Sequence, residues 1–201
     1  MAAAQLTLPG NGIPPSGDVR VSITGTAGRK DDADKVNSAL FDWMVEAAKY
    51  MIITHWKLDP ALVILVSGGA AFADHTAVRL FNQTPRGWGG LHLHLPCKFE
   101  DGRHVEDGFK SPGQYANYLH RQFSARCKFD SLAEINQAVV NGALVDSSKD
   151  GFHARNTEVA KSEYLIAFTF GIGSVPKDGG TSDTWNKCTS PNKIHLSLTQ
   201  S

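Results

Sequence analysis

The chain has 201 residues, of which 41% are hydrophobic. This is enough for one ordinary globular core and too little for a second full domain. Lysine and arginine together number 20, as do aspartate and glutamate, so no net charge draws the chain toward nucleic acid or acidic lipid. We therefore expect a single domain whose partner is not nucleic acid.

The spacing of the cysteines and the lengths of the apolar segments indicate in which cellular compartment the protein resides. Cys97, Cys127 and Cys188 lie far apart, without a C-x-x-C pair, which indicates reduced thiols and not a disulfide framework. The sequence shows neither a charged-then-apolar leader nor a stretch of about 18 apolar residues. We expect a cytoplasmic protein that neither enters nor binds a membrane.

The first elements follow a tail. Residues 1–17 are rich in proline and glycine and predict a flexible N-terminal segment. Residues 18–24 are β-branched and apolar, as in a strand. A helix is then predicted, with Asp31 or Asp32 as its N-cap. Its apolar stripe, at spacings of three and four, comprises Val36, Leu40, Trp43, Met44, Ala47 and Met51.

Strands and helices then alternate. Further strands are predicted over 61–66, 90–95, 163–170 and 193–198, with a helix over 70–81. Residues 97–150 interrupt the alternation with a polar loop and two predicted helices, near 115–123 and 132–140. We interpret this insert as a cap over a pocket or as a surface that pairs subunits.

The alternation predicts an α/β, Rossmann-like fold, with a mostly parallel sheet and helices on both faces. Ligands of such sheets bind outside the carboxyl ends of the strands. The apolar runs end in glycine, so we expect Gly25, Gly68 and Gly180 at one edge of the sheet.

Two glycine-rich turns are candidate ligand sites. Ser67, Gly68 and Gly69 follow a buried strand, where the backbone can approach a ligand, and Asp74 follows at a predicted helix start. The second turn offers glycine N–H groups and threonine hydroxyls to a phosphate; its candidate residues are Gly179, Gly180, Thr181 and Thr184. Neither turn is a Walker A or G-x-G-x-x-G motif, so we expect no cofactor.

Arg155 is the candidate anion ligand, with Asn156 beside it. It lies near the start of a predicted helix, where a positive charge is unfavourable unless a bound anion compensates it. Glu158 is either a surface partner of Arg155 or a catalytic carboxylate.

His92, His94 and Cys97 form a His-x-His-x-x-Cys pattern that suggests zinc. The two histidines would share one face of a strand, but the sequence places no fourth ligand nearby. We therefore predict no metal.

Three segments together resemble the SLOG superfamily, which contains the Lonely-guy enzymes and the DNA-processing-A proteins. The segment 23–31, ITGTAGRKD, is similar to the family's "TGxR–D", and 67–74, SGGAAFAD, to its "SGGARGAD". Segments 153–159, 163–168 and 179–184 resemble "RNxxM", "ADxLIAF" and "GGT". The match covers most of 18–198 apart from the insert. The resemblance implies a nucleotide pocket over the strand ends, to which Thr24, Gly25 and Arg29 would contribute, and association into dimers or larger oligomers.

In Lonely-guy enzymes, an arginine and a glutamate hydrolyse the N-glycosidic bond of a nucleoside monophosphate. Arg155 matches the arginine, but Thr184 stands near the glutamate's place and cannot act as a charged stabiliser or base near neutral pH. The leading hypothesis is therefore binding of a nucleotide or nucleotide-derived molecule, as in a sensor. An alternative is an N-glycoside hydrolase or transferase that uses Asp183 or Glu158. A lesser alternative is single-stranded DNA binding.

Overall fold

A computed structural model describes residues 18–84, 86–148, 151–177 and 179–199. Its centre is a six-stranded sheet with the order β6-β3-β2-β1-β7-β8, in which every pairing is parallel. The predicted tail, 1–17, lies outside the described residues.

The strands of the sheet are β1 (Val19–Gly25), β2 (Val63–Ser67), β3 (Gly90–His94), β6 (Leu144–Asp146), β7 (Tyr164–Thr169) and β8 (Asn192–Ser197). A small antiparallel hairpin joins β4 (Phe99–Glu100) to β5 (Arg103–His104). The α-helices are α1 (Ser38–Tyr50), α2 (His75–Gln83), α3 (Pro112–Cys127), α4 (Ser131–Val140), α5 (Phe152–Val159) and α6 (Gly179–Lys187). Short helical segments are η1 (Lys30–Lys35), η2 (Met51–His55) and η3 (Pro60–Leu62).

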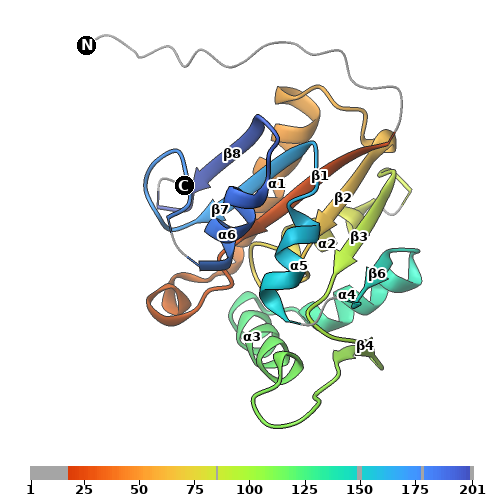
Figure 1. Ribbon diagram of the computed structural model, residues 1–201, viewed down its shortest axis with the longest axis vertical. Coiled ribbons are helices and arrows are strands. Elements are labelled where there is room, and N and C mark those ends of the chain that lie inside the picture. The colour runs from red at the N-terminus through yellow and green to blue at the C-terminus, as the bar shows by residue number, and fades with distance from the viewer. Residues whose placement is uncertain (1–17, 85, 149–150, 178, 200–201) are drawn as a thin grey trace.

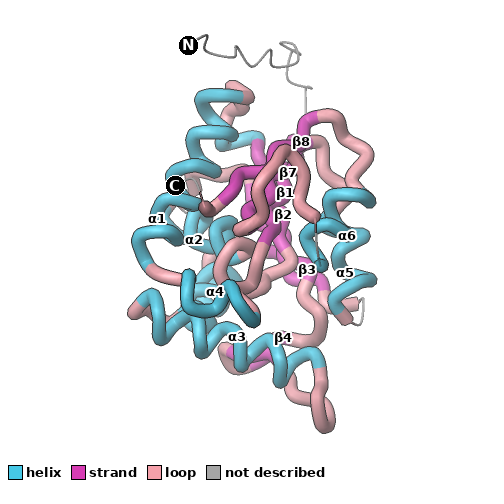
Figure 2. The backbone as a smooth tube through the Cα atoms, turned by 90° about the vertical axis from the view of Figure 1, so that its left-hand side faces the viewer, coloured by secondary structure: helices cyan, strands magenta, loops and turns pink. Residues whose placement is uncertain are grey.

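Helices cover both faces of the sheet, with α1 and α2 on one face and α5 and α6 on the other (Figures 1 and 2). Helix α3 lies by the end at which the strands terminate, and α4 packs against α2 and α3. The α/β, Rossmann-like architecture predicted from the sequence is confirmed.

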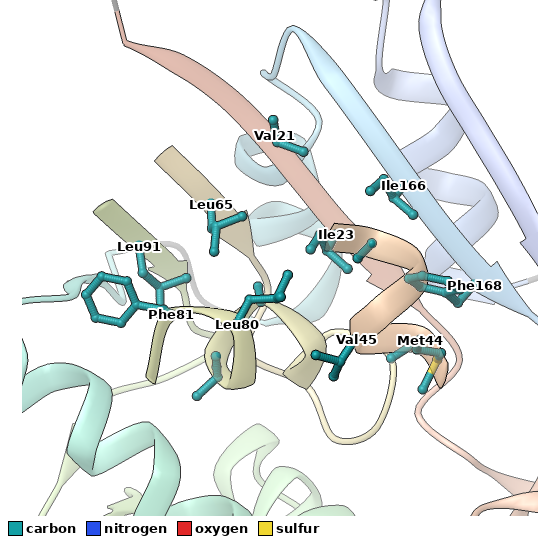
Figure 3. Close-up of a cluster of buried hydrophobic side chains, with 14 of the residues drawn as sticks. Val21, Ile23, Met44, Val45, Leu65, Leu80, Phe81, Leu91, Ile166 and Phe168 are labelled. Carbon is teal, nitrogen blue, oxygen red and sulfur yellow. The ribbon is translucent and has the colours of Figure 1, made fainter. Parts of the chain in front are cut away.

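The alternation of each strand produces two cores of unequal size. Val21, Ile23, Leu65, Ile166 and Phe168 point toward α1 and α2, where they meet residues such as Met44 and Leu80 (Figure 3). The opposite face is smaller and packs against α5 and α6 through a second cluster: Ala160, Leu165, Ala167, Trp185 and Cys188. The larger face therefore supplies most of the apolar burial, while the α5 and α6 face leaves room for polar residues.

The helix after β1 differs from its prediction. Residues 30–35 form the separate turn η1, and α1 begins only after Asn37, whose side chain accepts a hydrogen bond from the N–H of Leu40. Neither Asp31 nor Asp32 caps α1, so that prediction was wrong. Trp43, predicted in the core, is 37% exposed, because the buried stripe of α1 runs through Phe41, Met44, Val45 and Ala48.

The five strand predictions agree with β1, β2, β3, β7 and β8 to within two residues at either end. Residues 70–74 form a turn before α2, not the helix start that was predicted. Strand β6 was not predicted at all. It has three residues at the sheet edge, too few for a periodic pattern.

Within the described ranges, no helix combines the length and the apolar character needed to cross a bilayer.

Candidate functional site

A cavity of about 870 Å³ lies at the carboxyl ends of β1 and β7. The strand order reverses between these two strands, since β2, β3 and β6 lie on one side of β1 and β7 and β8 on the other. Such a switch point opens a crevice above the sheet, where ligands of parallel α/β folds bind. The volume suits a small organic ligand.

Gly25, the last residue of β1, forms the floor of this site. A Cβ atom at this position would collide with the carbonyl oxygen of Phe168 and the side chain of Ala73, so the close contact of β1, β7 and the turn before α2 requires glycine. The N–H of Gly25 donates to a carboxylate oxygen of Asp74 over 3.0 Å. The end of β1 is thereby joined to the turn after β2.

Arg155 and Asp74 form a buried pair beside this floor. Their side chains are 9% and 4% exposed, and the guanidinium Nη1 lies 3.9 Å from Asp74 Oδ2. Nη1 also donates to the carbonyl oxygen of Gly68. Burial raises the pKa of Asp74 above its ordinary value, and the positive charge of Arg155 opposes that rise.

This pair changes the interpretation of Arg155. Its charge already has a carboxylate partner within the protein, so a bound anion is not needed to compensate it at the helix start. Arg155 nevertheless lines the cavity, and its buried Nε has no hydrogen-bond partner among the described residues. It can therefore hold the site together while part of its side chain forms the wall of the cavity.

The start of α6 forms the opposite wall. Gly179 has a φ of 69°, a left-handed value that favours glycine, and the Arg29 guanidinium lies within 3.7 Å of the place where its Cβ would be. Asn156 donates to the carbonyl oxygen of Gly180 over 3.3 Å, which anchors this start to α5. The first N–H groups of a helix lack intrahelical partners and favour anions.

The cavity carries more positive than negative charge. Its lining includes five cationic side chains, Arg29, Lys30, Lys35, Arg155 and Lys177, and two carboxylates, Asp32 and Asp74. The carboxylates are engaged, since Asp32 pairs with Lys35 over 3.0 Å and Asp74 with Arg155. Among the described residues, Arg29, Lys30 and Lys177 have no carboxylate within ion-pair distance. Within the described part of the chain, three cations are thus available to an anion.

Aromatic side chains line another part of the cavity. Phe170 follows β7, Phe152 begins α5, and Tyr115 comes from α3 together with Leu119. The rings of Tyr115 and Phe152 meet edge to face, with centroids 6.2 Å apart. The insert thus contributes to the site, as the cap interpretation proposed, and gives it an apolar surface beside the cationic one.

The structure brings most of the predicted ligand residues together. Those that line the cavity are Thr24, Gly25, Arg29, Asp74, Arg155, Asn156, Gly179, Gly180 and Thr181. Four others do not reach its surface. Ser67, Gly68 and Gly69 lie behind the Arg155–Asp74 pair, where the Ser67 hydroxyl donates to the carbonyl oxygen of Asp74, and Thr184 donates within α6 to that of Gly180.

The two predicted catalytic carboxylates lie off the cavity lining. Asp183 accepts hydrogen bonds from Asn156 and Lys187, and these contacts hold the pKa of its carboxyl below the ordinary value although partial burial opposes them. Glu158 pairs with Lys161 over 2.8 Å. Neither forms part of the cavity surface, although Asp183 lies directly behind Asn156 and His153 of the lining.

Several lining residues outside the insert were missed by sequence reasoning: Thr26, Ala27, Lys30, Asp32, Lys35, Ala70, Phe152, His153, Thr169, Phe170, Gly171 and Lys177. Lysines on a polar turn carry no motif, so only the fold reveals that η1 and the loop before α6 converge. Phe170 and Gly171 could have been found, because residues directly after a parallel strand belong to the ligand edge.

Fold and site together define a Rossmann-like α/β protein with a cationic, partly aromatic cavity at its switch point. The chain is similar to "Uncharacterized protein R261" of Acanthamoeba polyphaga mimivirus, with 36% identity over 184 residues, which cover 90% of this chain and 97% of that protein. The chain belongs to the same family as this viral protein. No family model matches it. The relative's name assigns no activity, so the function proposed below rests on the residues of the site.

Proposed function

We propose that the cavity binds a nucleotide or a nucleotide-derived small molecule. The observation that carries this proposal is the joint presence of an aromatic wall and three cations that have no carboxylate partner among the described residues. Phosphate oxygens would lie against Arg29 and the start of α6, where a guanidinium and backbone N–H groups can donate to them. The base would lie against Tyr115, Phe152 or Phe170, since every base has a face that stacks on aromatic rings.

Membership of the SLOG superfamily is a further part of the proposal. The three segments that resemble it contribute Gly25, Asp74 and Gly180 to the lining of one cavity, although they are far apart in the sequence. Joint placement at one ligand edge is what a shared binding mode would require.

Binding without hydrolysis is the form that we favour. Glu158 and Asp183 are engaged in ion pairs and do not line the cavity, and the lining carboxylates are each paired with a cation. A protein of this kind would act as a sensor or carrier of the nucleotide.

Isothermal titration calorimetry with nucleoside 5′-monophosphates, the matching nucleosides and ribose 5-phosphate tests the proposal. We expect one site per chain, with the monophosphate binding more tightly than either fragment, because each fragment meets only one of the two surfaces. The proposal fails if no monophosphate binds at millimolar concentration, or if nucleoside and monophosphate bind equally. Chromatography of the same mixtures for free base separates binding from hydrolysis.

A further inference from the structure

A second site lies on the opposite part of the sheet, where β3 pairs with the edge strand β6. Leu91 and Leu93 of β3 join the large core, so the alternation turns His92 and His94 to the α5 face of the sheet. The parallel register places Asp146 of β6 directly beside His94. A carboxylate 52 residues further along the chain thereby joins the His-x-His pair.

The three side chains offer one ligand atom each, and these atoms lie within 4.8 Å of one another. His94 Nδ1 and Asp146 Oδ2 lie 3.3 Å apart, and the two imidazole rings have centroids 4.2 Å apart. A tetrahedral zinc ion with bonds of roughly 2.0–2.1 Å separates its ligand atoms by about 3.4 Å. One pair is thus at the required spacing, and small side-chain rotations would bring the third atom in.

His94 is a buried histidine with an unsatisfied ring nitrogen within the described residues. The residue is 4% exposed; among the described residues its Nε2 has no hydrogen-bond partner, and its Nδ1 lies 3.3 Å from Asp146 Oδ2. An unsatisfied buried polar group costs free energy and calls for an explanation such as an ion.

A backbone hydrogen bond orients the carboxylate of Asp146 toward His94. The N–H of Ser148 donates to its Oδ1 over 2.9 Å, which orients the carboxylate and leaves Oδ2 toward His94.

We propose that His92, His94 and Asp146 bind a divalent transition-metal ion of the zinc class. Two imidazoles and one carboxylate are a ligand set that zinc accepts, with a fourth position left for water or another ligand. His92 and Asp146 are partly exposed, so the ion can enter from solvent. The sequence pattern suggested Cys97 as third ligand; the geometry assigns Asp146 in its place.

The ion would tie the three-residue edge strand β6 to β3. None of its three ligands lines the nucleotide cavity, so metal binding and nucleotide binding can be measured separately.

Titration of tag-free, chelator-treated protein with Zn²⁺, in competition with a zinc-binding dye, tests the proposal. We expect one ion per chain at micromolar affinity or better. His92→Ala and Asp146→Asn, at partly exposed positions, should each lower the affinity at least about a hundredfold, since even partners outside the first shell cost roughly 10–100-fold. His55→Ala, a histidine away from the site, and Cys97→Ser should leave it unchanged.

Cobalt(II) provides a second readout, because its visible absorption reports coordination by protein ligands. The spectrum should appear with the wild type and vanish with Asp146→Asn, whose fold is checked by circular dichroism. Absence of Zn²⁺ binding at tens of micromolar overturns the proposal. So does binding that survives both ligand substitutions, or binding that is lost with Cys97→Ser.

Discussion

Arg155 on α5 and Asp74 before α2 form an ion pair across the edge of the sheet, with Nη1 3.9 Å from Oδ2 and both side chains at least nine-tenths buried. Asp74 also accepts from the N–H of Gly25, and Arg155 donates to the carbonyl oxygen of Gly68. Two side chains thus connect β1, β2 and α5 beneath the cavity, and the site depends on their remaining together.

Removal of Arg155 should destabilise the protein. Arg155→Ala leaves Asp74 buried without its cation, and loss of one partner of a buried pair typically costs roughly 3–5 kcal/mol in the free energy of unfolding. Urea denaturation at pH 7 measures it. Arg86→Ala, an exposed arginine outside the cavity lining, is the control and should cost less than about 0.5 kcal/mol.

The pair can be isolated by a double-mutant cycle. Asp74→Asn in the Arg155→Ala background removes the orphaned carboxylate and should recover part of the loss, with a coupling energy of roughly 0.5–3 kcal/mol. Additive effects of the two substitutions would mean that the pair does not hold the edge together.

His104 should make stability depend on pH. Burial, assisted by the positive charge of Arg155, lowers its pKa to about 4 in the folded state, against 6.5 ordinarily. Between these values the unfolded chain binds more protons, so its contribution is present above pH 6.5 and is lost as the pH falls toward 4. At pH 5 the loss is on the order of 2 kcal/mol.

His104→Phe keeps a ring and removes the titration. Its urea-measured stability should fall less than that of the wild type between pH 7 and pH 5. At pH 7 the substitution should cost little, since Nε2 of His104 is buried without a hydrogen-bond partner within the described ranges. Equal pH slopes for the two proteins would refute the assignment.

Tyr115 should contribute to binding of the base but not of the phosphate. Tyr115→Ala is expected to weaken binding of a nucleoside monophosphate by roughly 1–3 kcal/mol, the usual range for loss of one base–aromatic stack. Binding of ribose 5-phosphate should not change. Tyr50→Ala, which removes an exposed tyrosine of α1 outside the cavity lining, is the control. If Tyr115→Ala weakened binding of both ligands equally, or if both variants weakened binding of the monophosphate, the base would have to lie elsewhere.

Because Asp183 and Glu158 do not line the cavity, the protein should not hydrolyse a bound nucleoside monophosphate. We expect no free base when the wild type is incubated with nucleoside monophosphates. Thr184→Glu should not create the activity, because Thr184 is 1% exposed and lies outside the lining; a glutamate there would bury an unpaired charge and lower stability. Release of free base by the wild type would contradict the binding proposal and direct attention to Asp74 or Asp32.

Sequence reasoning recovered the sheet because apolar runs that end in glycine have a clear pattern in parallel folds. Sequence reasoning assigned Gly25, Gly180 and Arg155 to one ligand site, and in the structure all three line the same cavity. It missed the burial of Arg155, because the partner, Asp74, is 81 residues away and only the fold brings the two together.

The remaining differences have local causes. Trp43 has the helical spacing of a core residue, but α1 begins at Ser38 and rotates Phe41 into the core in its place. Asp146 could not be recognised as a partner of His94, because β6 is too short to be predicted and its pairing with β3 spans the whole insert.

Titration of a nucleoside monophosphate into the wild type, Arg29→Ala and Arg86→Ala tests the central claim most directly. Arg29 is exposed, has no carboxylate partner among the described residues and lies beside Gly179, so its loss should leave stability unchanged. We predict that Arg29→Ala lowers the affinity by about tenfold to a hundredfold, the worth of a charge-assisted contact of roughly 1.5–3 kcal/mol, and that Arg86→Ala binds like the wild type. Equal affinities for all three proteins would contradict the account.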